Sequence, residues 1–232
     1  MNKVYLDLGN TALKVFNSQG DLIETYLASD VCWIDRFKSF IALGGVEQAV
    51  LASVAVKEKE AAVMGVMKGV AVTKASCAKG SWKIQHSYKQ PHRLGIDRLL
   101  AIEAAYREVN DRLVVIDCGS AITLDSVDAD GFHLGGFIVP GYRLQMESLL
   151  NGTNLTFDAV EPAQDLGNDT SECIRNGSLR MITSLCESVI KECNPSKVIL
   201  TGGDVNGVLS SLRSLGGVDE LLVFKGLKYV YG

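Results

Sequence analysis

The same short pattern occurs twice in this chain, 110 residues apart, and it constrains the fold more than any other feature. In the first half, a short apolar strand ends in Asp7 and runs into the turn Gly9-Asn10-Thr11. In the second half, a similar strand ends in Asp117 and runs into the turn Gly119-Ser120. Each turn leads to a β-rich segment, a hairpin signal rich in Asn, Asp and Gly, and a further strand. The agreement predicts an internal duplication.

The elements expected after each hairpin also agree, so that the order βββαβαβ is predicted twice. The first half is expected to contain helices at about 33–41 and 57–68, and strands at 3–7, 12–16, 22–27, 49–56 and 70–73. The second half is expected to contain helices at about 142–150 and 170–193, and strands at 113–117, 122–127, 133–139, 198–201 and 221–224. A helix that starts near Asp97 joins the halves. We therefore expect an α/β chain with an N-terminal lobe, 1–110, that includes this helix, and a C-terminal lobe, 111–232, packed around a cleft.

Composition and charge narrow the class of protein. Of the 232 residues, 47% are apolar and 22% are charged, which is typical of a globular chain with a sizeable core. The net charge of −4 argues against nucleic acid as a partner, since binding a phosphate backbone needs a basic surface. There is no uncharged apolar run of 18 residues, and an acid at position 7 leaves no room for a signal peptide. We therefore expect no membrane span and a cytoplasmic location.

The cysteines and histidines show no metal-binding spacing. No two of the six cysteines lie within four residues of each other, so a CxxC zinc or redox pair is excluded, and free, mostly buried thiols are expected. The three histidines do not form an HExxH motif, which argues against a zinc enzyme.

The run from Asp7 to Lys14, Asp-Leu-Gly-Asn-Thr-Ala-Leu-Lys, has the residue types that a phosphate site needs. The glycine permits close approach of a ligand, Asn10 and Thr11 offer hydrogen bonds, and Lys14 adds a positive charge on the facing strand. An ordinary hairpin turn explains the same residues equally well. The similar turn after Asp117 favours the phosphate-binding interpretation, because two such turns facing each other across a cleft could bind a polyphosphate and its cations from both sides. This is not a Walker A loop, since the chain contains no Gly-x-x-x-x-Gly-Lys-Ser/Thr.

Six segments in register resemble the type III pantothenate kinases, members of the acetate and sugar kinase, heat-shock chaperone and actin (ASKHA) superfamily. They span nearly the whole chain: Asp7–Lys14, Tyr88–Arg98, Asp117–Asp125, Gly135–Gly141, Thr201–Gly203 and Leu222–Leu227. The chain departs from the family pattern at Ser120, where a threonine is usual, but the hydroxyl is kept. The resemblance implies a duplicated ribonuclease H-like, actin-like fold with two lobes and a central cleft.

The resemblance also implies roles for individual residues. ATP would be bound by Ser120 and by the turn residues Asp7, Leu8, Gly9, Asn10, Thr11, Ala12, Leu13 and Lys14. Asp97 would be the catalytic base, and pantothenate would contact Tyr88, Gly95, Ile96, Asp97, Arg98 and Thr170. Asp117 would hold a monovalent cation, potassium or ammonium, and Asp7 would lie near Mg²⁺ through water.

Structural explanations stand beside these roles. Asp97 and Thr170 each suit the start of a helix, and Tyr88 could serve packing alone. Asp7 and Asp117 could be satisfied by the backbone N–H groups of their own turns. Asp125 is either a support for the site or an exposed strand residue.

The activity implied is phosphorylation of pantothenate by ATP to give 4′-phosphopantothenate, the first step of coenzyme A biosynthesis. If Thr170 reaches the substrate of a partner subunit, the protein is a homodimer with a shared active site. The alternatives are a kinase for another small alcohol and a non-catalytic regulator that keeps the ASKHA fold.

Overall fold

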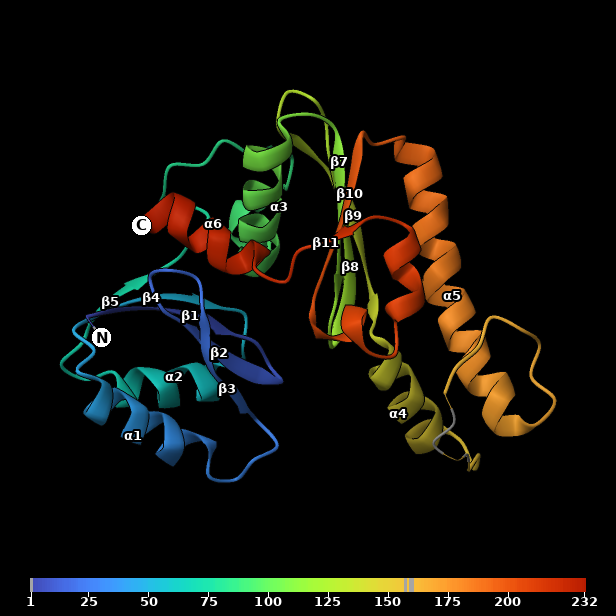
Figure 1. Cartoon of the computed structure of the whole chain (residues 1–232), viewed down its shortest axis with the longest axis horizontal. Helices are drawn as coiled ribbons and strands as arrows, with labels where there is room; N and C mark the ends of the chain where they lie inside the picture. The colour runs from blue at the N-terminus through green and yellow to red at the C-terminus, as the bar shows by residue number, and fades with distance from the viewer. Residues whose placement is uncertain (1, 157, 159–160) are drawn as a thin grey trace. The chain divides into compact units, whose positions relative to one another are not determined.

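The computed structural model describes residues 2–156, 158 and 161–232 (Figure 1). The chain divides into two compact units, the first comprising Met1–Arg107 with Leu221–Gly232 and the second comprising Glu108–Glu220. Among the helices of these described residues, none combines the length and apolar character that crossing a bilayer requires.

The first unit is built on a five-stranded sheet in the order β3-β2-β1-β4-β5. Strand β1 pairs antiparallel with β2 and parallel with β4, which confirms the predicted opening hairpins. The strands are β1 (Lys3–Leu8), β2 (Ala12–Phe16), β3 (Leu22–Leu27), β4 (Gln48–Ser53) and β5 (Ala71–Lys74).

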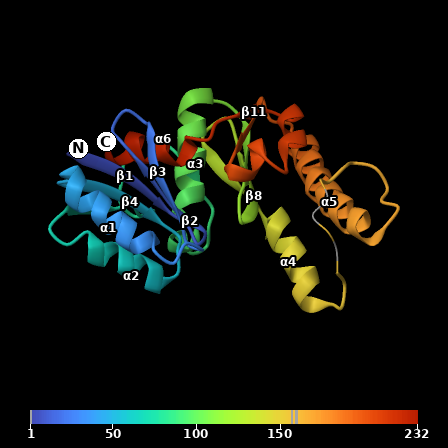
Figure 2. The same ribbon diagram turned by 60° about the horizontal axis from the view of Figure 1, so that its bottom comes forward.

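Helices cover both faces of this sheet, and the alternation of side chains along β1 decides what each face receives. Val4, Leu6 and Leu8 join one apolar cluster with Phe37 of α1 (Trp33–Gly44) and Val63 of α2 (Lys57–Val66). These two helices lie side by side on that face (Figure 1 and Figure 2). Since successive residues of a strand point to opposite faces, Tyr5 and Asp7 belong to the other face.

The other face packs against α6 (Leu222–Tyr231), the last helix of the chain. The Phe224 ring lies 5.3 Å from both the Tyr5 ring and the Phe16 ring. Helix α3 (Ile96–Val109) packs beside α6, and its Leu100 backbone comes so close to Gly226 that a Cβ there would lie 2.3 Å from the carbonyl oxygen.

The second unit repeats this arrangement of strands. Within it the order is β11-β10-β7-β8-β9, with β7 antiparallel to β8 and parallel to β10, as β1 is to β2 and β4. Its strands are β7 (Leu113–Cys118), β8 (Ala121–Val127), β9 (Phe132–Pro140), β10 (Lys197–Thr201) and β11 (Gly217–Val218). The predicted duplication is therefore confirmed in the order of strands across the sheet. The predicted chain order βββαβαβ is wrong for this unit, because two α-helices lie between β9 and β10 and two 3₁₀ helices lie between β10 and β11.

One face of this second sheet is covered by helices. Val114, Ile116 and Cys118 of β7 share an apolar cluster with residues of α4 (Tyr142–Gly152) and α5 (Thr170–Cys193). Asp117 therefore points to the opposite face of its sheet, as Asp7 does in the first unit. Among the described residues, the other regular segments are β6 (Gln85–His86) and the short 3₁₀ helices η1 (Pro91–Arg93), η2 (Gly203–Asn206) and η3 (Ser210–Ser214).

The end of the chain differs from the prediction. The expected strand at 221–224 is wrong, because these residues begin helix α6, and α6 belongs to the first unit rather than to the lobe 111–232. The apolar run Leu221–Phe224 is compatible with a buried strand or a buried helix. Packing of Phe224 and Gly226 onto β1, β2 and α3 decides for the helix.

The cysteines follow the prediction in part. All six are free, but only Cys118 and Cys186 are buried, whereas Cys32 and Cys173 are exposed.

Candidate functional site

The end of β1 and the turn after it bring several of the predicted site residues together. Asp7 is opposite Lys14 in the β1–β2 ladder, and the Gly9 amide closes the turn by donating to the Ala12 carbonyl at 2.9 Å. The pKa of Asp7 is raised to about 6. Burial is the largest cause; the charge of Lys14 lowers the pKa, and the charge of Asp97 raises it. A raised pKa means that nearby donors and cations do not fully replace the water that this carboxylate has lost.

The turn after Asp7 is held from outside. The Asn10 side chain accepts a hydrogen bond from the Val56 amide at 3.0 Å and donates to the Val54 carbonyl at 3.4 Å. Lys59, at the start of α2, donates to the Asn10 carbonyl. The Asn10 amide is thus engaged by the loop between β4 and α2, and this contact fixes the turn. Lys59 was not found from the sequence, where it is one charged residue in a polar helix.

Other members of the predicted motifs have buried side chains. Leu8 and Leu13 are each 1% exposed and Ile96 is 7% exposed. These three side chains therefore support the turn and the start of α3 from inside the fold.

The start of α3 holds Asp97 in one position. Its Oδ1 atom accepts a hydrogen bond from the Arg98 amide at 2.8 Å. A Cβ on Gly95 would lie 2.6 Å from this oxygen, so glycine is needed there for the carboxylate to keep its place. This hydrogen bond from the Arg98 amide agrees with the helix-capping role that the sequence also suggested for Asp97, and it orients the carboxylate.

Arg98 and Tyr88 form a second contact on the same helix. The Arg98 Nη1 atom donates to the Tyr88 hydroxyl at 2.9 Å, and the guanidinium carbon lies 5.9 Å from the centre of the Tyr88 ring. Arg98 is only 7% exposed, so its charge is held in place rather than free in solvent. The predicted substrate residues of the first unit therefore gather at the start of α3.

In the second unit, close backbone contacts surround Asp117 and Ser120. The Gly141 amide donates to the Ser120 carbonyl at 3.0 Å, and a Cβ on Gly141 would lie 2.2 Å from the Gly119 oxygen. Gly202, at a φ of +93°, approaches Asp117 so closely that a Cβ would lie 2.4 Å from its Oδ1. Glycine is thus required at both positions.

Asp204 is a further carboxylate that the sequence did not single out, and it lies on η2, which contacts β7. It follows Gly202-Gly203 and forms an ion pair with Arg143 at 3.4 Å. Burial raises the pKa of Asp204, and the Arg143 charge lowers it. A Gly-Gly-Asp run directly after a buried strand is the signal that could have found it.

The structure decides two points that the sequence left open, the exposure of Asp125 and the residue that caps α5. Asp125 is 2% exposed and its Oδ1 lies 2.7 Å from the Nε2 atom of the fully buried His133, so the interpretation as an exposed strand residue is wrong. The capping bond of α5 is made by Asp169, whose side chain accepts from the Glu172 amide at 2.9 Å. Thr170 is the exposed first residue of that helix.

Comparison with known proteins identifies relatives over most of the chain. A family model described as type III pantothenate kinase matches residues 3–192. A type III pantothenate kinase of Hahella chejuensis is 33% identical over 238 residues, covering 99% of this chain and 97% of the relative. One from a Marinomonas strain is 30% identical, covering 89% and 85%.

Solved structures bear on the fold alone. A Baf-family protein of Campylobacter jejuni aligns with a TM-score of 0.68 at 24% identity, over 97% of this chain and 95% of that one. The PilM–PilN type IV pilus biogenesis complex gives a TM-score of 0.53 at 12% identity, with 98% of each chain covered. The predicted fold class, an actin-like α/β fold of two duplicated halves, is confirmed.

The raised pKa of Asp7 gives a test on the ligand-free protein. The folded state keeps the Asp7 proton up to about pH 6, whereas the unfolded chain loses it near 3.8, so wild-type stability falls as the pH rises through this window. Asp7→Asn removes that loss, and it should raise the free energy of unfolding by roughly 3 kcal/mol above the window and by little below it. Urea unfolding at about pH 4 and about pH 8 in EDTA measures the difference.

Asp35→Asn is the control, because Asp35 is an exposed carboxylate in the first turn of α1. It should change stability equally at both pH values. An Asp7→Asn gain that does not depend on pH would show that the carboxylate is adequately compensated in the folded protein.

Proposed function

The chain belongs to the type III pantothenate kinase family, and we propose that it carries out this family's reaction. The residues proposed to act are those at the start of α3 and the end of β1 in the first unit, and those at the end of β7 in the second. The reaction moves the γ-phosphoryl group of ATP to the primary hydroxyl of pantothenate, giving ADP and 4′-phosphopantothenate for coenzyme A biosynthesis. We place it in the cytoplasm. The observation that carries the assignment of residues is the Asp97 carboxylate, held by its own helix beside Asp7 and the Arg98–Tyr88 pair.

Asp97 is the proposed general base. A carboxylate within hydrogen-bond reach of an alcohol takes the proton while the hydroxyl oxygen bonds to the γ-phosphorus and ADP leaves with the electrons of the broken P–O bond. The Arg98 amide and the glycine at position 95 fix the carboxylate before substrate arrives. Preorganisation of this kind lowers the cost of reaching the transition state.

Arg98 and Tyr88 are the proposed contacts of the substrate. Pantothenate has a carboxylate, and a guanidinium is suited to bind one in its planar fork. The hydrogen bond from the Arg98 Nη1 atom to the Tyr88 hydroxyl orients the guanidinium plane. Arg98 could equally neutralise charge that develops on the transferred phosphoryl group.

The nucleotide is proposed to use the turn from Asp7 to Lys14, together with Ser120. Lys14 supplies a positive charge opposite Asp7, and the bracing of Asn10 by Val56 and Lys59 keeps the turn in one conformation. Backbone N–H groups of a rigid turn bind phosphate without the entropy cost of ordering a loop.

Two cations complete the proposal, Mg²⁺ near Asp7 and potassium or ammonium at Asp117. Within the described residues no three His, Cys, Asp or Glu side chains converge on one point, so each cation would use a carboxylate together with backbone, water or phosphate oxygens. Asp7 suits this role because burial raises its pKa, and a cation beside the carboxylate would favour its charged form. Bound Mg²⁺ would neutralise phosphate charge, while the protein residues bind and orient the substrates.

A homodimer that shares its active site is also proposed. An apolar cavity of about 360 Å³ in the second unit is lined by residues of β9, α4 and α5, including Val139, Leu149 and Met181. Ile138, also on β9, is 61% exposed, and Met181 is 58% exposed. Exposed apolar surface of this kind is typical of an interface, and Thr170 starts the helix that carries Met181.

Replacing the proposed base gives the first test of the mechanism. Asp97→Asn keeps the size of the side chain but cannot accept a proton, so turnover should fall by roughly two to four orders of magnitude while the fold remains. Formation of phosphopantothenate, detected by mass, measures it. Gly95→Ala should also slow turnover, because the added Cβ would displace the carboxylate.

Asp35→Asn is the matched control, since Asp35 is likewise an acidic residue in the first turn of a helix. It loses only the interaction with the helix dipole and should keep wild-type turnover. Near-wild-type turnover in Asp97→Asn would reassign Asp97 to helix capping. Activity with other small alcohols but not with pantothenate would favour the alternative kinase.

The proposed monovalent site predicts a salt dependence. Oxygen ligands fixed by close backbone contacts around Asp117 cannot contract easily around a small ion, so activity should collapse in sodium and return with potassium or ammonium. Asp117→Ala should be inactive in all three salts while unfolding at a similar urea concentration. Equal wild-type rates in the three salts would remove the monovalent cation from the proposal.

The shared site predicts a dimer and complementation between variants. Light scattering should give about 50 kDa, twice the mass of one chain under two-fold symmetry. Mixing Asp97→Asn chains with Thr170→Val chains should form heterodimers with one intact site and recover part of the activity that each parent lacks. A fully active monomer would contradict the shared site and leave the kinase reaction in place.

A further inference from the structure

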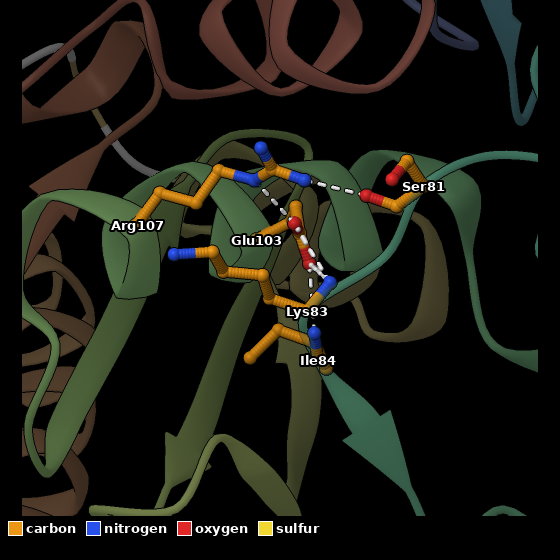
Figure 3. A network of polar contacts seen from close by, with 5 residues as sticks. All are labelled: Ser81, Lys83, Ile84, Glu103 and Arg107. Carbon is orange, nitrogen blue, oxygen red and sulfur yellow. Dashed lines mark hydrogen bonds and ion pairs between the residues drawn. The ribbon is translucent and has the colours of Figure 1, made fainter.

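A fully buried carboxylate on α3 takes no part in the site described above. Glu103 is 0% exposed, and its two oxygens accept hydrogen bonds from the Lys83 amide at 3.0 Å. They also accept from the Ile84 amide at 2.9 Å and from the Arg107 Nε atom at 2.5 Å. Figure 3 shows the carboxylate between the Arg107 side chain and the backbone of residues 83 and 84.

Arg107 extends the same contact. It lies one helical turn after Glu103, and its Nη2 atom donates a hydrogen bond to the Ser81 carbonyl. The guanidinium also lies over the Tyr229 ring of α6, 5.6 Å from its centre. Because burying a charge is costly unless it is fully bonded, this arrangement indicates that Glu103 is used to hold the backbone of residues 81–84.

The segment that Glu103 holds leads to the predicted substrate residues. From Ser81 the chain runs through Tyr88 and returns to α3 at Gly95, with only the two-residue β6 and the three-residue η1 as regular structure. One end of this strap, residues 81–95, is bonded to the middle of α3, and the other end continues into the start of the same helix. Tyr88 lies between the two ends and receives the bond from Arg98.

We propose that Glu103 is a positioning residue for pantothenate. By fixing residues 81–84 it sets the path of the strap, and so it keeps the Tyr88 hydroxyl against Arg98 before substrate binds. The inference rests on the proposed function, in which Tyr88 and Arg98 contact pantothenate. Its consequence is specific, because loosening the strap should weaken pantothenate binding without touching Asp97 or the nucleotide turn.

Glu103→Gln tests the proposal. The amide keeps one oxygen for the Lys83 and Ile84 amides but loses the charge that strengthens these bonds and the pair with Arg107. KM for pantothenate should rise about tenfold, the scale of one charge-assisted hydrogen bond, while kcat and KM for ATP stay within about twofold. Hydrogen exchange of the Lys83 and Ile84 amides should become faster in the variant.

Two further variants keep the test decisive. Arg107→Met keeps the apolar stem but removes the bonds to Glu103 and Ser81, and if Glu103→Gln fails to fold it decides the question by the same KM criterion. Ile102→Val removes one methylene from a fully buried neighbour on α3, so it loses stability without changing the strap and should leave KM for pantothenate unchanged.

The outcomes distinguish failure of the Glu103 positioning role from failure of the proposed pantothenate kinase activity. A folded Glu103→Gln with wild-type KM for pantothenate, or one in which kcat and both KM values change together, would overturn the positioning role. If the wild-type protein does not phosphorylate pantothenate, the proposed function fails, and exchange of the Tyr88 amide judges the anchor by itself. Unchanged exchange there would reject the anchor as well.

Discussion

Carboxylate side chains that leave water must recover the lost hydration from nearby donors or cations, and this chain meets that requirement in different ways at different places. Glu103 is surrounded by two backbone amides and the Arg107 guanidinium. Asp125 is paired with the buried His133. Asp7 has Lys14 opposite it, but the neighbouring Asp97 works against this, and its pKa remains at about 6. The first two carboxylates are satisfied within the fold, whereas the loss of hydration at Asp7 is offset only in part.

Close backbone approach is the second constraint on the site. Side chains at Gly95, Gly141 and Gly202 would each collide with an atom of a predicted site residue or of its turn. Polar atoms at the end of a strand can be surrounded closely only if the neighbouring chain has no Cβ there. The glycines therefore shape the surroundings of Asp97, Ser120 and Asp117 by the absence of a side chain at each position.

Strand alternation explains why Asp7 and Asp117 each lie on the sheet face opposite the one covered by two helices, α1 and α2 in the first unit and α4 and α5 in the second. In β1 and β7 the apolar residues at even positions enter a cluster with two helices, and the aspartate comes at an odd position. A one-residue shift in either strand would place a carboxylate in an apolar core. The fold of the family thus ties the position of each charge to the register of its sheet.

The sequence by itself determined the duplication, the three strands that open each half and the short motifs around Asp7, Asp97 and Asp117. These features depend on residues close together in the chain, where alternation, turn composition and helix starts act locally. Only the tertiary structure decided that 222–231 is a helix, that Asn10 is bonded to Val56 and Lys59, and that Glu103 holds residues 81–84. These outcomes depend on contacts between distant segments, such as Phe224 with Tyr5, and no local pattern records which distant partner a side chain meets.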